Sequence, residues 1–284
     1  MTRPANFSGR CRMIVADLDG TFLDSAKRIP PENLAAVREA QRAGIHFACA
    51  SGRCWKSLRE VMGDLNLTGL QLADNGSTIV EAPQWRVLES ARLPADAVRM
   101  VWELSCQHGF TPQLATPDDY FCYDLDEEGR LDMLRHHEYP TPCATVEELL
   151  SHLGECCKLT FFAARQPLEA RQAFVAELNR QFDARAIPLY SYFTESEVFC
   201  VASTAVSKLS GIEKLCARMG CTLNDVVALG DGDNDAEMLA GCGLAFAMDN
   251  ATPRAKAAAT HLVASCDDAG AAQAIRMVLN GNAF

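Results

Sequence analysis

Two aspartates separated by one residue follow a short apolar segment near the start of the chain. Residues 13–16, Met-Ile-Val-Ala, are apolar and partly β-branched, which predicts a buried strand that delivers Asp17 and Asp19 into a loop. Residues two apart on an extended chain point to the same side, so both carboxylates can meet one cation or one reacting atom. Without a metal or a shared proton they repel each other. The alternative is an ordinary acidic turn at Asp19-Gly20.

A second acid-rich loop follows another apolar run near the other end of the chain. Residues 226–229, Val-Val-Ala-Leu, predict a short buried strand that ends at Gly-Asp-Gly-Asp-Asn-Asp, 230–235. If the two strands are neighbours in a parallel sheet, Asp17, Asp19, Asp231 and Asp235 meet at one edge. Four carboxylates together require a cation, and an all-oxygen set favours Mg²⁺. A calcium loop is excluded because positions 236 and 242 are Ala and Cys instead of Gly and Glu.

A hydroxyl and an ammonium complete the set of polar groups at predicted strand ends. Ser51 follows the predicted strand 45–50, where its hydroxyl and the backbone N–H groups after it, from Gly52 on, can bind a phosphate oxygen. Lys208 begins a predicted helix that returns to the sheet, which can place its ammonium beside Asp17. Each alone is more simply a helix cap or a surface charge. Together with the aspartates they describe a metal-assisted phosphoryl-transfer site.

Alternating strands and helices position these residues. Strands at 13–16, 45–50 and 70–73 alternate with helices at 32–41 and 55–65, and residues 74–76 form a turn. The alternation resumes with a helix at 208–219, the strand 226–229, a helix from 236, a strand at 244–248, and helices at 253–259 and 270–279. This order predicts a Rossmann-like, doubly wound parallel sheet, whose ligands bind at the carboxyl ends of the strands.

The middle of the chain lacks this alternation. Helices are predicted at 95–108, 146–153 and 168–182, and strands at 159–163, 187–193 and 198–202. Such a pattern is typical of an inserted α+β unit. We therefore expect a discontinuous α/β core domain, 1–84 and 203–284, with an α+β cap domain, 85–202, that acts as a lid.

Composition narrows the classes of partner. At 284 residues the chain exceeds the usual size of a single core, and its net charge of −11 argues against binding to nucleic acid or to an anionic membrane. No signal peptide and no membrane span is evident, and the thirteen cysteines are expected to be reduced, so we expect a cytoplasmic protein. The sequence leaves the oligomeric state open. A small phosphorylated metabolite remains a suitable ligand, because a metal and a few cations can reverse the charge within one pocket.

Four motifs in order resemble those of the haloacid dehalogenase-like superfamily. They are Asp-Leu-Asp-Gly-Thr at 17–21, Ser-Gly-Arg at 51–53, Ser-Lys at 207–208 and Gly-Asp-Gly-Asp-Asn-Asp at 230–235. The insertion between the second and third motifs resembles the caps of the Cof-type phosphatases. The resemblance covers essentially the whole chain.

The resemblance implies a role for each motif residue. Asp17 would be the nucleophile that forms a phosphoaspartyl intermediate, and Asp19 the acid that protonates the leaving oxygen and then the base that activates water. Mg²⁺ would bind Asp17, Asp231 and the backbone carbonyl of Asp19. The phosphoryl group would be held by Ser51, Gly52, Lys208 and Asn234. Asp235 would support the metal or the lysine.

Three residues depart from the family pattern. Members often have Gly-Val-Ser-Lys-Gly and Ala-Met-Gly-Asn-Ala, where this chain has Ala205 and Leu209 around the lysine and Asp249 in the later loop. None of these changes removes a catalytic group. They concern the shape of the substrate pocket and the charge near the metal.

These inferences lead to a Mg²⁺-dependent phosphatase of small phosphorylated metabolites, with sugar phosphates as the first candidates. One alternative is a phosphosugar mutase, in which Asp19 returns the phosphoryl group to a sugar instead of to water. Another is a weakly catalytic regulatory protein that senses a phosphorylated ligand. Specificity would come from the cap, where Tyr120, Tyr123 and Arg130 are possible contributors.

Overall fold

Contacts divide the chain into two compact units in the computed structural model, which describes residues 7, 9–124, 127–135 and 138–281. The first unit contains Met1–Gly52, Val61–Arg86 and Ser207–Phe284, and the second contains Arg53–Glu60 and Val87–Val206. The domain boundaries expected from the sequence remain a prediction. They differ from these units by placing residues 53–60 and 203–206 with the core and residues 85–86 with the cap.

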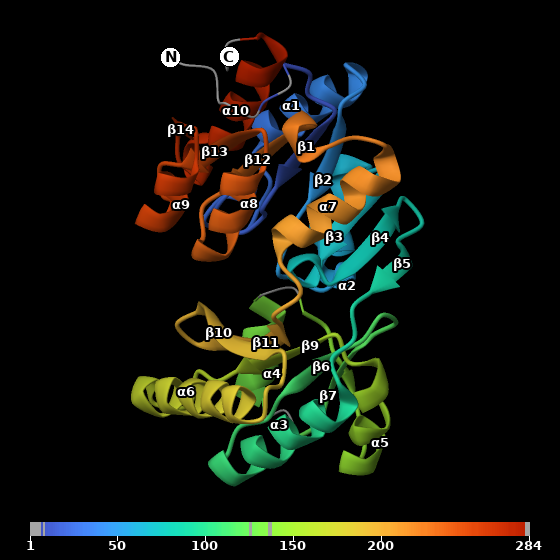
Figure 1. Cartoon of the computed structure of the whole chain (residues 1–284), viewed down its shortest axis with the longest axis vertical. Coiled ribbons are helices and arrows are strands. Elements are labelled where there is room, and N and C mark those ends of the chain that lie inside the picture. Colours follow the sequence, from blue (N-terminus) through green and yellow to red (C-terminus); the bar gives the residue numbers. More distant parts are fainter. Residues whose placement is uncertain (1–6, 8, 125–126, 136–137, 282–284) are drawn as a thin grey trace. The chain divides into compact units, whose positions relative to one another are not determined.

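A five-stranded parallel sheet forms the centre of the first unit. Its order is β14-β13-β12-β1-β2 (Figure 1). The strands are β1 (Met13–Ala16), β2 (His46–Cys49), β12 (Val226–Gly230), β13 (Leu244–Met248) and β14 (His261–Val263). All four strand pairs are parallel. The predicted doubly wound α/β core is therefore confirmed, with the added edge strand β14. β1 pairs with β12 on one side and β2 on the other.

Helices flank this sheet in two groups, and the helices within each group pack against one another. They are α1 (Pro31–Arg42), α7 (Lys208–Met219), α8 (Ala236–Gly241), α9 (Pro253–Ala258) and α10 (Gly270–Leu279). α1 packs against α10, whereas α8 packs against both α7 and α9; Figure 1 shows α7 and α8 in front of the sheet. The apolar strands are thereby buried, and their ends are held where the acidic loops begin.

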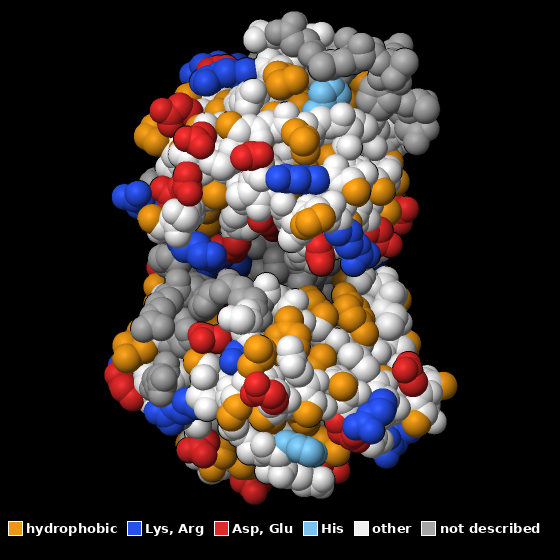
Figure 2. All heavy atoms as spheres, turned by 90° about the vertical axis from the view of Figure 1, so that its left-hand side faces the viewer, with side chains coloured by type: hydrophobic (Ala, Val, Ile, Leu, Met, Phe, Trp, Pro, Cys, Tyr) orange, Lys and Arg blue, Asp and Glu red, His pale blue; other side chains and the backbone are white. Residues whose placement is uncertain are grey.

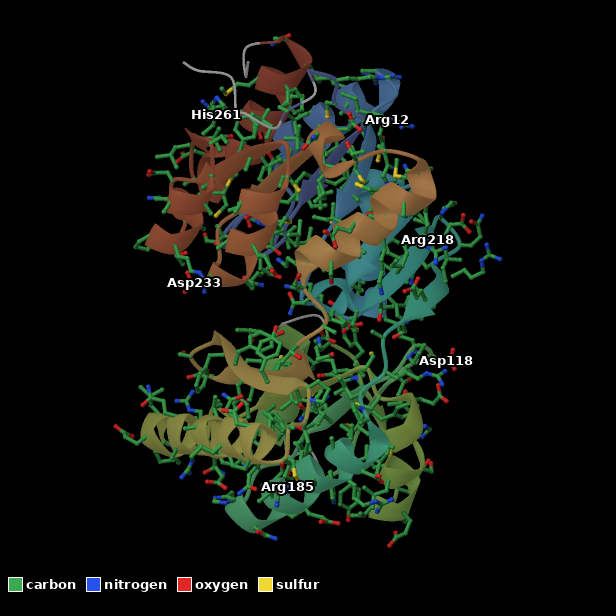
Figure 3. The ribbon with its side chains drawn as sticks, viewed as in Figure 1. Arg12, Asp118, Arg185, Arg218, Asp233 and His261 are labelled. Carbon is green, nitrogen blue, oxygen red and sulfur yellow. The ribbon has the colours of Figure 1, made fainter. Side chains whose placement is uncertain are left out.

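The start of α7 is determined by a reciprocal cap. The Ser207 hydroxyl accepts a hydrogen bond from the Ser210 N–H (3.2 Å), and the Ser210 hydroxyl accepts one from the Ser207 N–H (2.9 Å). At the other end Arg12, labelled in Figure 3, donates to the carbonyl oxygens of Met219 and Gly220. Both ends of the helix that begins with Lys208 are therefore satisfied by side chains.

The third predicted strand belongs to a different sheet from the one we expected. β3 (Gly69–Ala73) forms an antiparallel sheet with β4 (Thr78–Ala82), and β5 (Arg86–Ser90) adds the outer strand. β3 meets the end of β2 through one parallel bridge, Ala50 to Leu72. The Gln71 side chain of β3 makes two more hydrogen bonds with the backbone of β2. It accepts from the Cys49 N–H (2.9 Å) and donates to the Phe47 carbonyl (3.3 Å).

The second unit is α+β, as predicted. Its six-stranded sheet has the order β10-β11-β9-β6-β7-β8 and is antiparallel except for the pair β7 and β8. The strands are β6 (Gln113–Ala115), β7 (Tyr120–Cys122), β8 (Thr141–Pro142), β9 (Lys158–Phe162), β10 (Leu189–Glu195) and β11 (Val198–Ser203). The helices are α2 (Trp55–Val61), α3 (Ala95–His108), α4 (Glu127–Arg135), α5 (Val146–Ser151) and α6 (Leu168–Ala184).

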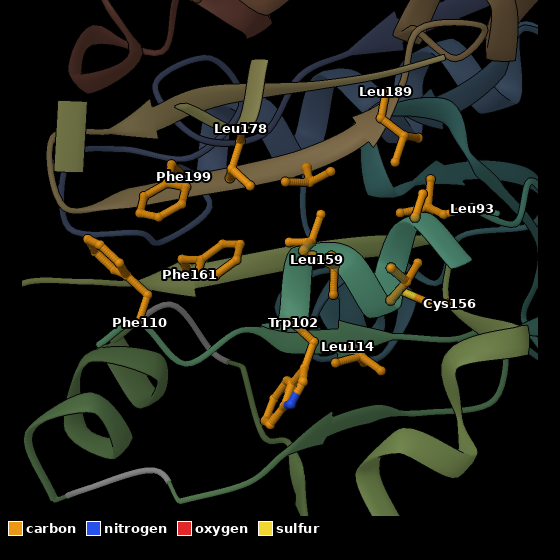
Figure 4. Close-up of a cluster of buried hydrophobic side chains, with 14 of the residues drawn as sticks. Leu93, Trp102, Phe110, Leu114, Cys156, Leu159, Phe161, Leu178, Leu189 and Phe199 are labelled. Atoms are coloured by element: carbon orange, nitrogen blue, oxygen red, sulfur yellow. The ribbon is translucent and has the colours of Figure 1, made fainter. Parts of the chain in front are cut away.

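An aromatic and aliphatic core holds the second unit together. Phe199 is fully buried and stacks on Phe161 at 4.5 Å between ring centroids, next to Phe110 and Phe174. Figure 4 shows Phe161 of β9 and Phe199 of β11 in one cluster with side chains such as Trp102 from α3. This unit therefore has a core of its own.

No helix within the described residues is long and apolar enough to cross a membrane. On the face drawn in Figure 2, the Lys and Arg side chains that the structure describes are interspersed with Asp and Glu side chains.

Candidate active site

Two adjacent strands bring three of the four predicted aspartates together, whereas the Asp19 carboxylate pairs with Lys27. β1 and β12 pair with Ala16 opposite Leu229, so Asp17 and Asp231 leave the sheet at neighbouring strand ends. The Asp17 N–H continues the ladder by donating to the Leu229 carbonyl (2.9 Å). Carboxylate oxygens of Asp17, Asp231 and Asp235 all lie within 4.8 Å of one another. Residues from opposite ends of the chain thus form one acidic cluster, as the parallel arrangement predicts.

Lys208 lies between two of these aspartates. Its Nζ is 2.6 Å from Asp17 Oδ1 and 2.6 Å from Asp235 Oδ1, and its side chain is 1% exposed. The second oxygen of Asp235 accepts from the N–H groups of Asp231 (3.0 Å) and Gly232 (2.9 Å). Both oxygens of Asp235 are therefore engaged, which favours support of Lys208 and the loop over a place as a metal ligand.

Asp231 packs directly against the first acidic loop. The Thr21 hydroxyl donates to Asp231 Oδ1 (2.6 Å), and Gly20 has a φ of +82°. A Cβ on residue 20 would overlap the Asp231 carboxylate, so only glycine allows this approach. Sequence reasoning did not assign Thr21, although it is the last residue of the first motif.

Burial and like charge raise the pKa of Asp17 and of Asp231. The pKa of Asp17 is well above its usual range because of burial first, and because Asp235 and Asp231 are close, while Lys208 acts in the opposite direction. The pKa of Asp231 is raised to about 6, again by burial first and then by Asp235 and Asp19. Burial alone lowers the pKa of Lys208, but Asp17 and Asp235 more than offset it, so the pKa is raised and the ammonium stays charged.

The donor set fits a magnesium ion. The cluster brings together three carboxylates, those of Asp17, Asp231 and Asp235, whereas Lys208 provides one ammonium, which contacts two of them. Oxygen-only ligands at the mouth of a parallel sheet suit Mg²⁺, which also accepts substrate phosphate as a ligand. The residues that would hold it are Asp17, Asp231 and the backbone carbonyl of Asp19.

The predicted phosphate-binding residues meet through Asn75. Ser51 is buried at the end of β2, and its carbonyl accepts from the Asn75 N–H (2.8 Å). The Asn75 side-chain oxygen accepts from Asn234 Nδ2 (3.4 Å), and a Cβ on Gly52 would lie 3.3 Å from the Asn75 amide. Sequence reasoning identified 74–76 as a turn after a strand but not as part of the site. The same strand-end argument that selected Ser51 also applies to Asn75.

The departures from the family pattern lie on the periphery. Leu209 points at Gly241 of α8, where an added Cβ would lie 2.7 Å from both of its methyl groups. The Asp249 side chain is 77% exposed and pairs with Lys256 at 3.8 Å. Ala205 is exposed. None of these three residues contacts the acidic cluster.

Comparisons with known proteins agree with this geometry. The family model described as haloacid dehalogenase-like hydrolase matches residues 14–275. The chain is 26% identical over 265 residues to the 5-amino-6-(5-phospho-D-ribitylamino)uracil phosphatase YcsE of Bacillus subtilis (strain 168), covering 93% of this chain and 94% of that protein. It is 27% identical to the HMP-PP phosphatase of Serratia proteamaculans (strain 568), covering 86% of each. In fold it is similar to a haloacid dehalogenase-like hydrolase from Bacteroides thetaiotaomicron, with a TM-score of 0.83, 22% identity, and coverage of 95% of this chain and 100% of that chain.

Proposed function

The chain belongs to the haloacid dehalogenase-like hydrolases, and from that membership we propose that it is a Mg²⁺-dependent phosphatase of small phosphorylated metabolites. Its curated relatives are phosphatases by name, which makes it a phosphoric monoester hydrolase. The observation that carries the mechanism is the Lys208 ammonium held 2.6 Å from both Asp17 and Asp235, with Asp231 in the same cluster.

Asp17 performs the first chemical step. One of its carboxylate oxygens attacks phosphorus, and the bond from phosphorus to the leaving oxygen breaks as Asp19 transfers a proton to that oxygen. Lys208, Ser51 and Asn234 bind the equatorial phosphoryl oxygens and so stabilise the transition state. A bound Mg²⁺ would neutralise charge on the phosphoryl group and on the carboxylates that hold it.

Asp19 acts again in the second step. As a carboxylate it takes a proton from water, whose oxygen attacks the phosphorus of the phosphoaspartate. The bond to Asp17 then breaks, which releases inorganic phosphate and returns the carboxylate. Lys208 stays charged throughout, because the pKa of its ammonium is raised.

The organic part of the substrate is a small polar group. Sugar phosphates are the first candidates on the sequence argument, and the name of the Bacillus subtilis relative adds a phosphorylated ribityl chain attached to an aminouracil. A screen should therefore contain both classes. Closure of the cap over the substrate, which would exclude water, is part of the proposal.

Replacement of Asp17 tests the mechanism. We expect Asp17→Asn to reduce turnover of p-nitrophenyl phosphate with Mg²⁺ by at least about 10⁴-fold, because the nucleophile is lost. The matched control is Asp233→Asn in the same loop as Asp231. Asp233, labelled in Figure 3, is exposed and accepts a hydrogen bond from Thr252 (2.7 Å), which asparagine can also do. Substantial activity in Asp17→Asn would contradict the proposal.

Product analysis separates the remaining functions. A phosphatase releases inorganic phosphate from a hexose 1-phosphate, whereas a mutase yields the 6-phosphate. A sensor would turn over no compound of a broad panel, yet one of them would raise its melting temperature.

A further inference from the structure

A lysine that belongs to none of the motifs contacts the proposed acid and base. Lys27 Nζ lies 2.8 Å from Asp19 Oδ1, and the two side chains are 31% and 30% exposed. The contact is thus partly shielded from solvent. Exposed ion pairs of this kind contribute only about 0–1 kcal/mol to stability, so stability is a weak reason for its presence.

The loop that carries Lys27 is closed at its base and tied to the rest of the unit. The Lys27 N–H donates to the Asp24 carbonyl (2.9 Å), and the Asp24 N–H donates to the Arg28 carbonyl (2.9 Å). The Asp24 carboxylate accepts from the Arg28 N–H (2.9 Å), and the Ser25 N–H donates to Asp267 (2.8 Å). Lys27 itself has a φ of +59°, a conformation that costs a non-glycine residue about 1 kcal/mol. The backbone therefore holds Lys27 in place.

Asp19 lies on an equally fixed backbone. The Leu18 carbonyl accepts from the N–H groups of Phe22 (3.0 Å) and Leu23 (2.8 Å), which closes a turn around Asp19. Asn250 donates to the Gly20 carbonyl (2.8 Å) from the other side. With both backbones held, the contact with Lys27 restrains Oδ1 of the Asp19 carboxyl group.

We infer that Lys27 is a positioning residue that orients Asp19 for proton transfer to the leaving oxygen. This inference rests on the proposed function. An ammonium only donates hydrogen bonds, so with Lys27 on Oδ1 the transferable proton resides on the other oxygen, Oδ2. In the first step that proton moves from Oδ2 to the leaving oxygen as the bond to phosphorus breaks. Without Lys27 the carboxyl group samples several rotamers and is less often aligned with the leaving oxygen.

The leaving group provides the readout. p-Nitrophenolate departs with little protonation, whereas an alkoxide needs a proton from the enzyme. We expect Lys27→Met to lower kcat/KM for an alkyl phosphate, 2-glycerophosphate, at least about 10-fold more than for p-nitrophenyl phosphate. Lys27→Arg keeps a hydrogen-bond donor at this position. It should restore most of the wild-type ratio of kcat/KM for 2-glycerophosphate to kcat/KM for p-nitrophenyl phosphate. If Lys27 acted in folding alone, its replacement would lower kcat/KM for both substrates equally.

Arg28→Met is the matched control from the same loop. Arg28 pairs with Asp24 instead of Asp19, and its side chain is 77% exposed, so this variant should keep the wild-type ratio. An unchanged ratio in Lys27→Met, or an equal loss on both substrates, would overturn the inference while Asp17→Asn remains inactive. Failure of the proposed function looks different, because the wild-type enzyme would then hydrolyse neither substrate.

Discussion

Lys208 is the residue on which the charge balance of the cluster depends. Its ammonium lies within hydrogen-bonding distance of both Asp17 and Asp235, and all three side chains are buried. A buried charge that loses its partner is costly, because the low-dielectric interior cannot solvate it. The same contact that serves phosphate binding therefore also stabilises the fold.

Removal of this ammonium should destabilise the protein. We expect Lys208→Met to lower the free energy of unfolding by about 3 kcal/mol, measured by denaturant titration, because two buried carboxylates lose their counter-charge. Adding Asp235→Asn to it should recover part of the loss. Lys256→Met, which breaks only the exposed pair with Asp249, should change stability by less than about 1 kcal/mol. A Lys208→Met protein as stable as the control would contradict this account.

The raised pKa of Asp231 predicts a linked dependence on pH and Mg²⁺. Since the pKa rises from 3.8 to about 6 in the folded protein, its contribution to stability is present at low pH and is lost as the pH rises through about 6. The proposed Mg²⁺ site uses the ionised carboxylate, so the increase in melting temperature caused by Mg²⁺ should grow over the same interval. Thermal unfolding across this pH range with Mg²⁺ and with chelator measures both trends. Asp231→Asn should remove them, and a Mg²⁺ effect that is larger below pH 6 would be the opposite of the expectation.

At the scale of elements, α7 approaches the end of β3 closely enough to place Lys208 in the cluster. Gly211 of α7 faces Gly76, which follows β3, and a Cβ on Gly211 would lie 2.9 Å from the Gly76 Cα and 3.0 Å from a Leu72 methyl group. Two glycines thus allow the helix and the turn to pack without intervening side chains. Capping at Ser207 determines where the helix begins, and this packing determines how close it comes.

Gly211→Ala should therefore destabilise the protein despite the higher helix propensity of alanine. Alanine normally favours a helix interior by about 1 kcal/mol, but overpacking here should cost about 1–3 kcal/mol and should lower kcat by displacing Lys208. Denaturant unfolding and steady-state kinetics measure the two effects. Gly63→Ala is the control, because nothing lies within 4 Å of an added Cβ there. A more stable or fully active Gly211→Ala protein would show that the helix can shift without consequence.

At the scale of the whole molecule, the chain has two compact units, and the second unit has a hydrophobic core of its own. The acidic cluster and its supporting residues all belong to the first unit, whereas the aromatic core around Phe199 belongs to the second. Ligands that bind one unit stabilise it by mass action without acting directly on the other.

Calorimetry should resolve this division. Phe199→Ala is expected to lower the stability of the second unit by about 3–5 kcal/mol, because it removes a fully buried ring. Mg²⁺ should raise the unfolding temperature of the first unit alone. Leu262→Ala, at a side chain that is 59% exposed, should change neither transition. One cooperative transition that both perturbations move together would argue against separate units.

Local patterns in the sequence were sufficient for most elements and for the chemical character of the site. Apolar runs that end in acids predicted β1 and β12, and the helices predicted at 95–108 and 208–219 have the bounds of α3 and α7. Hydrophobic period, turn residues and caps act over a few residues, so they can be read along the chain. The elements for which no bounds were predicted include β4, β5, β8, β14 and the charged helix α4, whose sequences are short or lack a clear apolar period.

Tertiary structure alone decided which side chains meet. It placed β3 in an antiparallel hairpin instead of the parallel sheet, and it linked Ser51 to Asn234 through Asn75. It also brought hydrogen-bond donors to both oxygens of Asp235 and paired Lys27 with Asp19. These contacts depend on sheet order, helix approach and loop closure, which arise from packing between distant segments. The sequence by itself determined that carboxylates, a lysine and a hydroxyl lie at strand ends. Only the folded chain determined which carboxylate oxygen each cation holds.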